Sequence, residues 1–404
     1  MGNDDTTIGT RLRELRHWRR MTLAEVAGLA GISVVYLSMA ERGLRPLDRR
    51  SMISALAAAL RVSESELTGG PHLGTDPLQS GPHAAIPALR AALAMNAIGE
   101  PATDRARPLP VLVAELDALR PAHAAGDFIR MGGALPGLID ELYVRVSEPA
   151  DEAAKITAAG TLAEACRLAA SMCHSLSYND LSQLAARTAV DAARLTGDPV
   201  RVSMARVEQI GTAPRVWDRS LALAERAAAE LEPHARDETG FQVLGMLTLR
   251  CALSAAVMQD GALAGHWLGE AQALAGRVND DDPAGNWEWF GATNVAIWRV
   301  AIAVERGESG RVVCELASAA DPAKLTVPTR RGGLYLDVAR GLAREKATQD
   351  DAVTWLRRAE SAAPQWFRNY PAARESVAFL LTRARATAGG RELRGMAARM
   401  GVPH

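Results

Sequence analysis

Nine arginines lie between Arg11 and Arg50, where only four acidic side chains accompany them. The resulting excess of five positive charges is local, because the whole chain has a formal net charge of -1. Guanidinium groups bind phosphate oxygens through charge-assisted hydrogen bonds. The cluster therefore predicts a surface that binds nucleic acid near the N-terminal end of the chain.

The other residues whose chemistry could support catalysis or metal binding are not spaced for it. Cys166, Cys173 and His174 can meet on one side of a helix, but no second pair of ligands follows at a metal-site spacing. The acidic run from Asn279 to Asp282 lacks the order of a calcium loop. The sequence has no phosphate-binding glycine loop, no His-Glu-x-x-His and no nucleophile elbow. We therefore expect no enzymatic activity, no metal and no cofactor.

Capping residues define two short helices inside the arginine-rich region. Thr22 and Glu25 have the spacing of a capping box, which predicts a helix over residues 23–30. Gly31 ends this helix, and Ser33 can cap a second one over residues 34–41. Two helices joined by so tight a turn are typical of a helix-turn-helix. Apolar residues at helical spacing predict a helix before the pair and another after it: Ile8, Leu12, Leu15, then Ile53, Leu56, Ala57 and Leu60.

The region over residues 8–67 resembles the phage-repressor family of helix-turn-helix proteins, the XRE type. An ordered set of motifs carries the resemblance: Arg13-Glu-Leu-Arg16, Met21-Thr-Leu-Ala-Glu-Val-Ala27, Gly31-Ile-Ser33, Tyr36-Leu-Ser38 and Glu41-Arg-Gly43. It implies an interior ion pair between Arg16 and Glu41 that ties the first helix to the recognition helix. It also implies that Gly43 takes a left-handed conformation, in which a side chain would clash.

The same resemblance implies which residues face DNA. The recognition helix enters the major groove while nearby turns and arginines hold phosphates. The candidates for phosphate or groove contacts are Ser33, Tyr36, Ser38, Arg42 and Arg45, and the candidate for the adjacent minor groove is Arg49. The positions that usually read base edges are occupied by Leu23, Val34, Val35 and Met39. None of these can make bidentate hydrogen bonds to a base, so we expect modest base specificity that rests on thymine methyl groups and DNA shape.

Composition divides the chain into a small N-terminal module and a long helical region. The chain of 404 residues is 48% hydrophobic and 23% charged, which is typical of a globular protein with more than one domain. We expect a helix-turn-helix domain over residues 1–68, a linker over 69–85 that is too rich in glycine and proline for a helix, and a helical domain over 86–404. Four cysteines, no signal region and no apolar run of membrane length predict a cytoplasmic protein without membrane contact.

The long region shows helical periodicity and almost no β-branched alternation, so the fold class is predicted to be all-α. Antiparallel helix pairs recur about every 40 residues, with second helices expected near Ser177, Trp217, Gly261, Glu308, Ala347 and Gly390. Small residues in these segments allow close helix packing. The pattern resembles tetratricopeptide-like repeats, which stack into a superhelix with a concave inner surface.

A helix-turn-helix followed by such repeats resembles the peptide-sensing quorum regulators of Gram-positive bacteria and similar large actinobacterial regulators. The resemblance implies a peptide or small-molecule effector. Within a helix expected over residues 287–306, one stripe combines flat aromatics with an amide, and a later helix could add a charge and a ring: Trp287, Asn294, Trp298, then Arg331 and Tyr335. The alternative is that both tryptophans fill gaps between repeats and Asn294 bonds a neighbouring helix.

We therefore expect a transcription regulator that binds double-stranded DNA as a homodimer and whose repeat domain senses an effector and mediates dimerisation. The alternative is a protein-interaction scaffold with a vestigial helix-turn-helix. In that case the apolar side chains of Val34, Val35 and Met39 would form a convenient patch for a protein partner.

Overall fold

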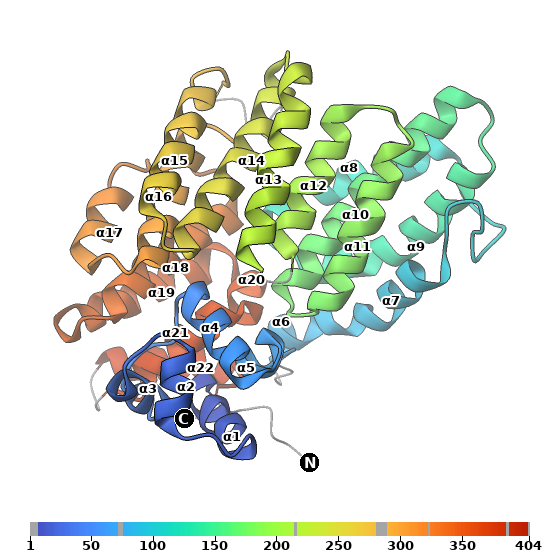
Figure 1. Cartoon of the computed structure of the whole chain (residues 1–404). Helices are drawn as coiled ribbons and strands as arrows, with labels where there is room; N and C mark the ends of the chain where they lie inside the picture. The colour runs from blue at the N-terminus through green and yellow to red at the C-terminus, as the bar shows by residue number, and fades with distance from the viewer. Residues whose placement is uncertain are drawn as a thin grey trace.

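The protein is described by a computed structural model that covers residues 7–71, 76–213, 216–279, 289–321, 324–384 and 388–402. Within these ranges the regular structure is helical, and the only extended pairing is an isolated bridge between Ala97 and Glu100. The all-α prediction is therefore confirmed. Figure 1 shows a small N-terminal module beside a curved array of paired helices.

The N-terminal module contains five short helices around its own core. They are α1 (Ile8–Trp18), α2 (Leu23–Leu29), α3 (Val34–Glu41), α4 (Arg50–Leu60) and α5 (Glu64–Thr68). The predicted capping box is present, because Thr22 Oγ1 accepts from the N–H of Glu25 while the Glu25 carboxylate accepts from the N–H of Thr22. Ser33 caps α3 as expected, by accepting from the N–H of Tyr36 at 3.1 Å. Apolar side chains from every helix fill the centre, among them Leu12, Val26, Leu37, Leu56 and Leu67.

The segment that follows the module is helical where the structure describes it. The prediction of a linker without helix is wrong for residues 76–85, which form α6 (Pro77–Ser80) and the 3₁₀ turn η1 (Gly81–Ala85). Asp76 starts α6 by accepting from the N–H groups of Leu78 and Gln79. Both Gln79 and His83 are buried against the last part of the array, where each hydrogen-bonds Asn369. Burial against the array thus stabilises these helical turns, although their glycine and proline residues disfavour helix locally.

The long region, residues 76–402, forms what we call the helical array. It opens with α7 (Ile86–Met95), α8 (Leu109–Ala125) and α9 (Phe128–Ser147). The first helices of the following pairs are α10 (Glu152–Ser175), α12 (Pro199–Thr212), α14 (Glu238–Val257), α16 (Ala292–Arg306), α18 (Pro328–Ala343) and α21 (Pro371–Leu381). Short connecting pieces are η2 (Glu232–His234), η3 (Lys346–Thr348) and α20 (Pro364–Asn369).

The predicted register of the helix pairs is confirmed. The second helices are α11 (Asn179–Arg194), α13 (Trp217–Leu231), α15 (Gly261–Ala275), α17 (Gly310–Ala317), α19 (Gln349–Ala362) and α22 (Ala388–Met400), and each begins within two residues of its expected position. The helix expected over residues 287–306 instead begins at Ala292, since extended backbone at Gly291 precedes it. Trp287 lies outside the described residues.

Hydrogen bonds join the early helices of the array to its late helices. Gln365, in α20, accepts from the N–H of Ile129 at 3.1 Å and donates to Asp127 at 2.9 Å. Thr329 of α18 donates to the carbonyl of Ala124 at 3.0 Å. These bonds join helices more than 200 positions apart in sequence. The inner faces of the pairs therefore surround a central cavity of about 300 Å³.

One core helix has the length and composition of a membrane span. Helix α14 contains an apolar stretch of 18 residues with a mean hydropathy of 1.4, and 83% of this stretch is buried inside the protein. It packs against α13, α15 and α16. Its apolar surface is therefore accounted for by neighbouring helices of the array.

Candidate nucleic-acid interface

Helices α2 and α3 form the angular pair on which the interface is built. Their axes are bent by 111° relative to one another. Gly31 makes the turn with a φ of +67°, and Gly43 has a φ of +70° just after α3. Both angles lie in the left-handed region that favours glycine. The left-handed conformation expected at Gly43 is confirmed.

A buried ion pair holds α3 against α1. The carboxylate of Glu41 accepts from Nε and Nη2 of Arg16 at 2.6 and 2.8 Å. Nη1 of Arg16 donates to the carbonyl of Met21, just before the N-cap of α2, at 3.1 Å. The hydrogen bonds that Arg16 donates to Glu41 raise the pKa of Arg16 above its already high usual value. The predicted interior pair is confirmed, and it orients the recognition helix.

The outer face of α3 is open to solvent and mostly apolar. Val34 and Val35 are 43% and 68% exposed. Ser38 and Met39 are half-buried, whereas Leu37 and Ala40 point into the module core. Two branched apolar side chains therefore protrude where a groove-binding helix usually carries hydrogen-bonding groups.

Two candidate DNA contacts at the start of α3 also make hydrogen bonds within the module. Ser33 Oγ accepts from the N–H of Tyr36, and its proton stays available to a phosphate oxygen. The hydroxyl of Tyr36 donates its single proton to the carbonyl of Pro46 at 2.8 Å. Burial raises the pKa of Tyr36. In this conformation Tyr36 braces the loop after α3 and has no proton left for a phosphate.

The loop after α3 presents cations in two different settings. Arg42 and Arg45 are exposed, and Nε of Arg42 donates to the carbonyl of Ser38 at 3.1 Å. Arg49 is half-buried beside the array, where a Cβ at Gly307 would lie 3.1 Å from its Nη1. A minor-groove role for Arg49 would require its side chain to leave Gly307. Arg42 and Arg45 are therefore the better placed of the predicted phosphate ligands.

Part of the arginine cluster binds the array instead of solvent. The Glu305 carboxylate of α16 accepts from the backbone N–H and from Nη1 of Arg50, at 2.7 and 2.9 Å, and from Nη2 of Arg340 at 3.1 Å. The Glu305 side chain is fully buried. Burial alone would raise its pKa, but the charges of Arg50 and Arg340 outweigh burial and hold the pKa of Glu305 below its usual range.

Further contacts extend this docking of the module. Arg344 binds Asp48 at 2.8 Å, and the Glu375 carboxylate accepts from the N–H of Ile8 at 3.1 Å at the start of α1. Trp217 donates to Ser54 Oγ at 3.2 Å. Arg340 and Arg383 also donate to the carbonyls of Asp48 and Leu44. No local sequence signal could have revealed these pairs, because the partners are separated by 163 to 367 positions.

Among the described residues proposed from sequence for effector binding, Trp298 lines the central cavity and the others do not. Trp298 is 7% exposed and lines the central cavity, with the Arg250 guanidinium 5.4 Å from its ring centroid. Asn294 is buried, donates to Met246 Sδ at 3.4 Å, and its Oδ1 has no hydrogen-bond partner among the described residues. Asn294 therefore bonds a neighbouring helix, as the alternative interpretation expected.

The two residues expected to join this stripe from α18 point elsewhere. Tyr335 packs on Trp355 of α19, with ring centroids 5.4 Å apart. Neither Arg331 nor Tyr335 lines the central cavity, whereas the neighbouring Arg330 does. The helical phase of α18 explains the difference, since adjacent residues are rotated by about 100° around a helix axis.

The cysteines on α10 are core residues. Cys166 and Cys173 are fully buried. Burial raises the pKa of Cys173 to about 12. Because the thiolate is the reactive and metal-binding form, these thiols pack as small apolar groups at neutral pH.

The N-terminal module is similar to a known protein family. Residues 7–68 match the family model described as a helix-turn-helix domain. The match covers α1 to α5 and ends before the array. The comparison with curated proteins and the comparison with solved structures each gave no match. Together with the open outer face of α3, this match supports a helix-turn-helix DNA-binding regulator.

Proposed function

We propose that this helix-turn-helix protein is a cytoplasmic transcription regulator of the XRE type whose helical array, residues 76–402, acts as its sensor domain. The observation that carries the proposal is the outer face of α3. It is exposed while the rest of the module is held by a buried ion pair and by the array. A helix presented in this way fits the major groove of duplex DNA.

The side chains around α3 define the proposed mode of binding. Arg42 and Arg45, with the Ser33 hydroxyl, would hold phosphates on either side of the groove. Val34 and Val35 would meet thymine methyl groups, and Ser38 and Met39 would lie at the edge of the contact. Since apolar groups cannot distinguish guanine from adenine by hydrogen bonds, sequence preference would come largely from thymine positions and from DNA shape.

We further propose that the regulator binds as a homodimer. One module of this size reads few base pairs, and two modules spaced by one helical turn of DNA would gain affinity by binding two half-sites. Because the module is bonded to the array, the array would set the distance between the two recognition helices. Dimerisation would therefore involve the tetratricopeptide-like pairs and not only the modules.

The effector is proposed to bind inside the array. The central cavity combines aromatic walls, including Trp298, with the guanidinium groups of Arg250 and Arg330. A short peptide or a small molecule with an anionic group would suit this lining. A quorum-type signal is one example of such an effector.

Fluorescence anisotropy with the full chain and a random-sequence duplex library tests the proposal. We expect binding that weakens with salt, and enrichment of a palindromic site with two half-sites. Light scattering on the enriched complex should give two chains per duplex. The absence of duplex binding at low salt, with or without cell extract as a source of effector, would refute the regulator.

A protein-binding scaffold is the second candidate, because Val34 and Val35 form an exposed apolar pair. Replacement of both valines by serine separates the two functions. Loss of duplex binding, with folding retained, supports the regulator. Unchanged weak duplex binding together with loss of a co-purifying protein would support the scaffold.

A further inference from the structure

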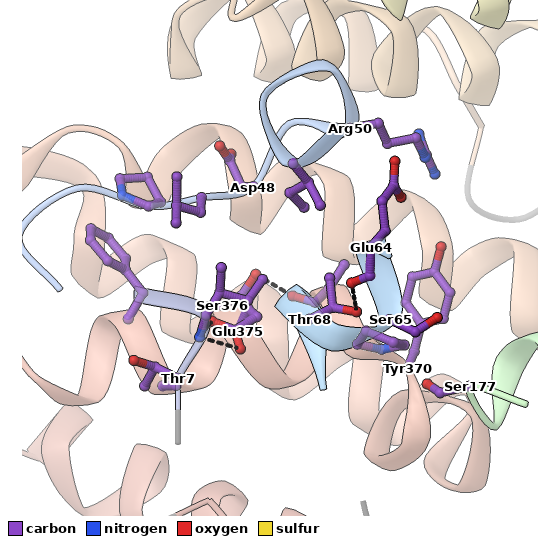
Figure 2. A pocket seen from close by; sticks show the side chains of 18 of the residues that line it. Thr7, Asp48, Arg50, Glu64, Ser65, Thr68, Ser177, Tyr370, Glu375 and Ser376 are labelled. Carbon is purple, nitrogen blue, oxygen red and sulfur yellow. Dashed lines mark hydrogen bonds between the residues drawn. The ribbon is translucent and has the colours of Figure 1, made fainter. Parts of the chain in front are cut away.

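A second cavity lies between the module and the array. Its volume is about 330 Å³, and its walls come from both sides of the interface. Figure 2 shows side chains of both walls, among them Thr68 of the module and Ser376 and Tyr370 of the array. Ligand sites occur preferentially at such junctions between domains. This cavity adjoins the central one proposed for the effector and shares Arg50 and Tyr370 with it, but most of its lining residues belong to it alone.

The charged side chains that line this cavity are either exposed to solvent, as Arg45 and Asp180 are, or bonded to other residues of the chain. Arg50 and Arg340 bind the buried Glu305 carboxylate. Glu375 accepts from Arg11 and from the N–H of Ile8. A charged ligand would lose its hydration here without gaining a counter-ion, so burial of an ionised group would be unfavourable.

Apolar atoms contribute more of the cavity surface than polar atoms do. Ile8, Leu47 and Ile53 line the cavity from the module. Ala343 and Phe379 line it from α18 and α21. A largely apolar body would therefore be favoured by burial of its surface.

The remaining polar atoms define complementary hydrogen bonds. Thr68 donates to the carbonyl of Glu64 at 2.8 Å and Ser376 donates to the carbonyl of Ala372 at 2.7 Å, so each hydroxyl oxygen offers a lone pair but no further proton. Arg340, whose side chain is 5% exposed, lines the cavity, and its Nε has no hydrogen-bond partner among the described residues. This Nε atom is itself buried, and the polar lining also includes Asn179, Gln183 and Tyr370, so Thr68 and Ser376 supply two acceptors within a larger set of polar groups.

We infer that this cavity binds an uncharged, largely apolar small molecule that carries a hydroxyl or amide donor for Thr68 and Ser376. Such a ligand contacts both walls only while the module is docked. It therefore stabilises the docked arrangement by mass action. The regulatory consequence, a fixed orientation of α3 for DNA, rests on the proposed function, whereas ligand binding does not.

The uncharged dye Nile red, titrated into the full chain without DNA, tests the site. We expect saturable blue-shifted emission with one dye per chain, and weaker binding of the anionic dye anilinonaphthalene sulfonate. Thr68→Leu and Ser376→Leu fill the cavity from opposite walls, and each should weaken Nile red binding about tenfold or more. Circular dichroism identifies which of the two variants is folded, and either one suffices.

The matched control fills the central cavity instead. Gly333 lines that cavity, and a Cβ there would meet no atom within 4 Å, so Gly333→Leu should leave Nile red binding unchanged. The dye should also slow hydrogen exchange over residues 8–68, because it holds the docked state. Three results would each overturn the inference: no saturable binding, binding to folded Thr68→Leu or Ser376→Leu as tight as to the wild type, or loss of binding only in Gly333→Leu. None of these results depends on whether the protein binds DNA.

Discussion

Two faces of the module use arginine in opposite ways. On the outer face Arg42 and Arg45 reach solvent. On the docking face Arg11 and Arg50 bind Glu375 and the fully buried Glu305 of the array. The difference teaches that a cluster of arginines in sequence does not define one surface. Position relative to carboxylates of distant helices decides which of them stay available to phosphates.

Paired and exposed arginines also contribute differently to the stability of the fold. A buried charge that loses its partner is costly, because it has left water and gains nothing in return. An exposed arginine has little effect on folding, and its value lies in the long-range attraction of a polyanion. Substitutions on the docking face should therefore act on stability, and substitutions on the outer face on DNA binding.

The largest expected effect is that of Glu305→Ala. It leaves both Arg50 and Arg340 without their shared carboxylate in a buried site, so the free energy of unfolding should fall by about 3–5 kcal/mol. Urea denaturation of the full chain, followed by circular dichroism, measures this. An unchanged midpoint would show that the docking pair is not formed in solution.

Glu305→Gln tests how the contribution of Glu305 to the unfolding free energy depends on pH. The pKa of Glu305 is lowered in the folded protein, so its stabilisation is fully present above the unfolded pKa of about 4.3 and is lost as pH falls through the folded pKa. The difference in unfolding free energy between wild type and Glu305→Gln should therefore be constant at neutral pH and shrink below about pH 4. A difference that grows on acidification would contradict this assignment.

Glu41→Ala tests the corresponding pair inside the module. It strands Arg16, whose side chain is 9% exposed, and we expect a loss of unfolding free energy of about 3 kcal/mol. Hydrogen exchange should accelerate first over residues 8–68, since the pair joins α1 to α3 within this module. Uniform acceleration over the whole chain would instead indicate that the module has no stability of its own.

Arg45→Ala and Arg11→Ala remove the same charge from opposite faces of the module. If Arg45 contacts a phosphate, its removal should lower the salt dependence of duplex binding by about one unit of slope. Arg11→Ala should leave the slope unchanged, because Arg11 is bonded to Glu375 and to the carbonyl of Leu67 at 2.9 Å. Fluorescence anisotropy between low and moderate salt gives both slopes. Equal slopes in the two variants would remove the distinction between the faces.

Tyr36→Phe should have the smallest effect. It deletes the hydrogen bond to the carbonyl of Pro46, and we expect a loss of about 1 kcal/mol of stability without any change in the salt slope of DNA binding. A lowered slope would show that the hydroxyl turns to a phosphate when DNA binds. Thermal unfolding and the same anisotropy assay distinguish the two outcomes.

The local features of the module could be predicted because their causes are local. The capping box of Thr22 and Glu25, the cap at Ser33 and the left-handed Gly43 each depend on residues within a few positions of one another. The starts of the second helices in the array followed from apolar periodicity for the same reason. The Arg16 to Glu41 pair was available only through resemblance to a family.

The tertiary structure decided everything that depends on distant partners. Sequence alone determined that the chain is helical, that a helix-turn-helix begins it, and where the helix pairs recur, since backbone capping and periodic burial act over one or two helical turns. It did not determine that residues 76–85 would be buried helix, that Arg330 and not Arg331 would line the central cavity, or that Arg50 would meet Glu305. Those outcomes depend on closure of the array, on docking of the module and on the orientation of α18, and the first two bring together residues 200 or more positions apart. Docking of the module creates the cavity between module and array, whose walls no single segment of the chain contains.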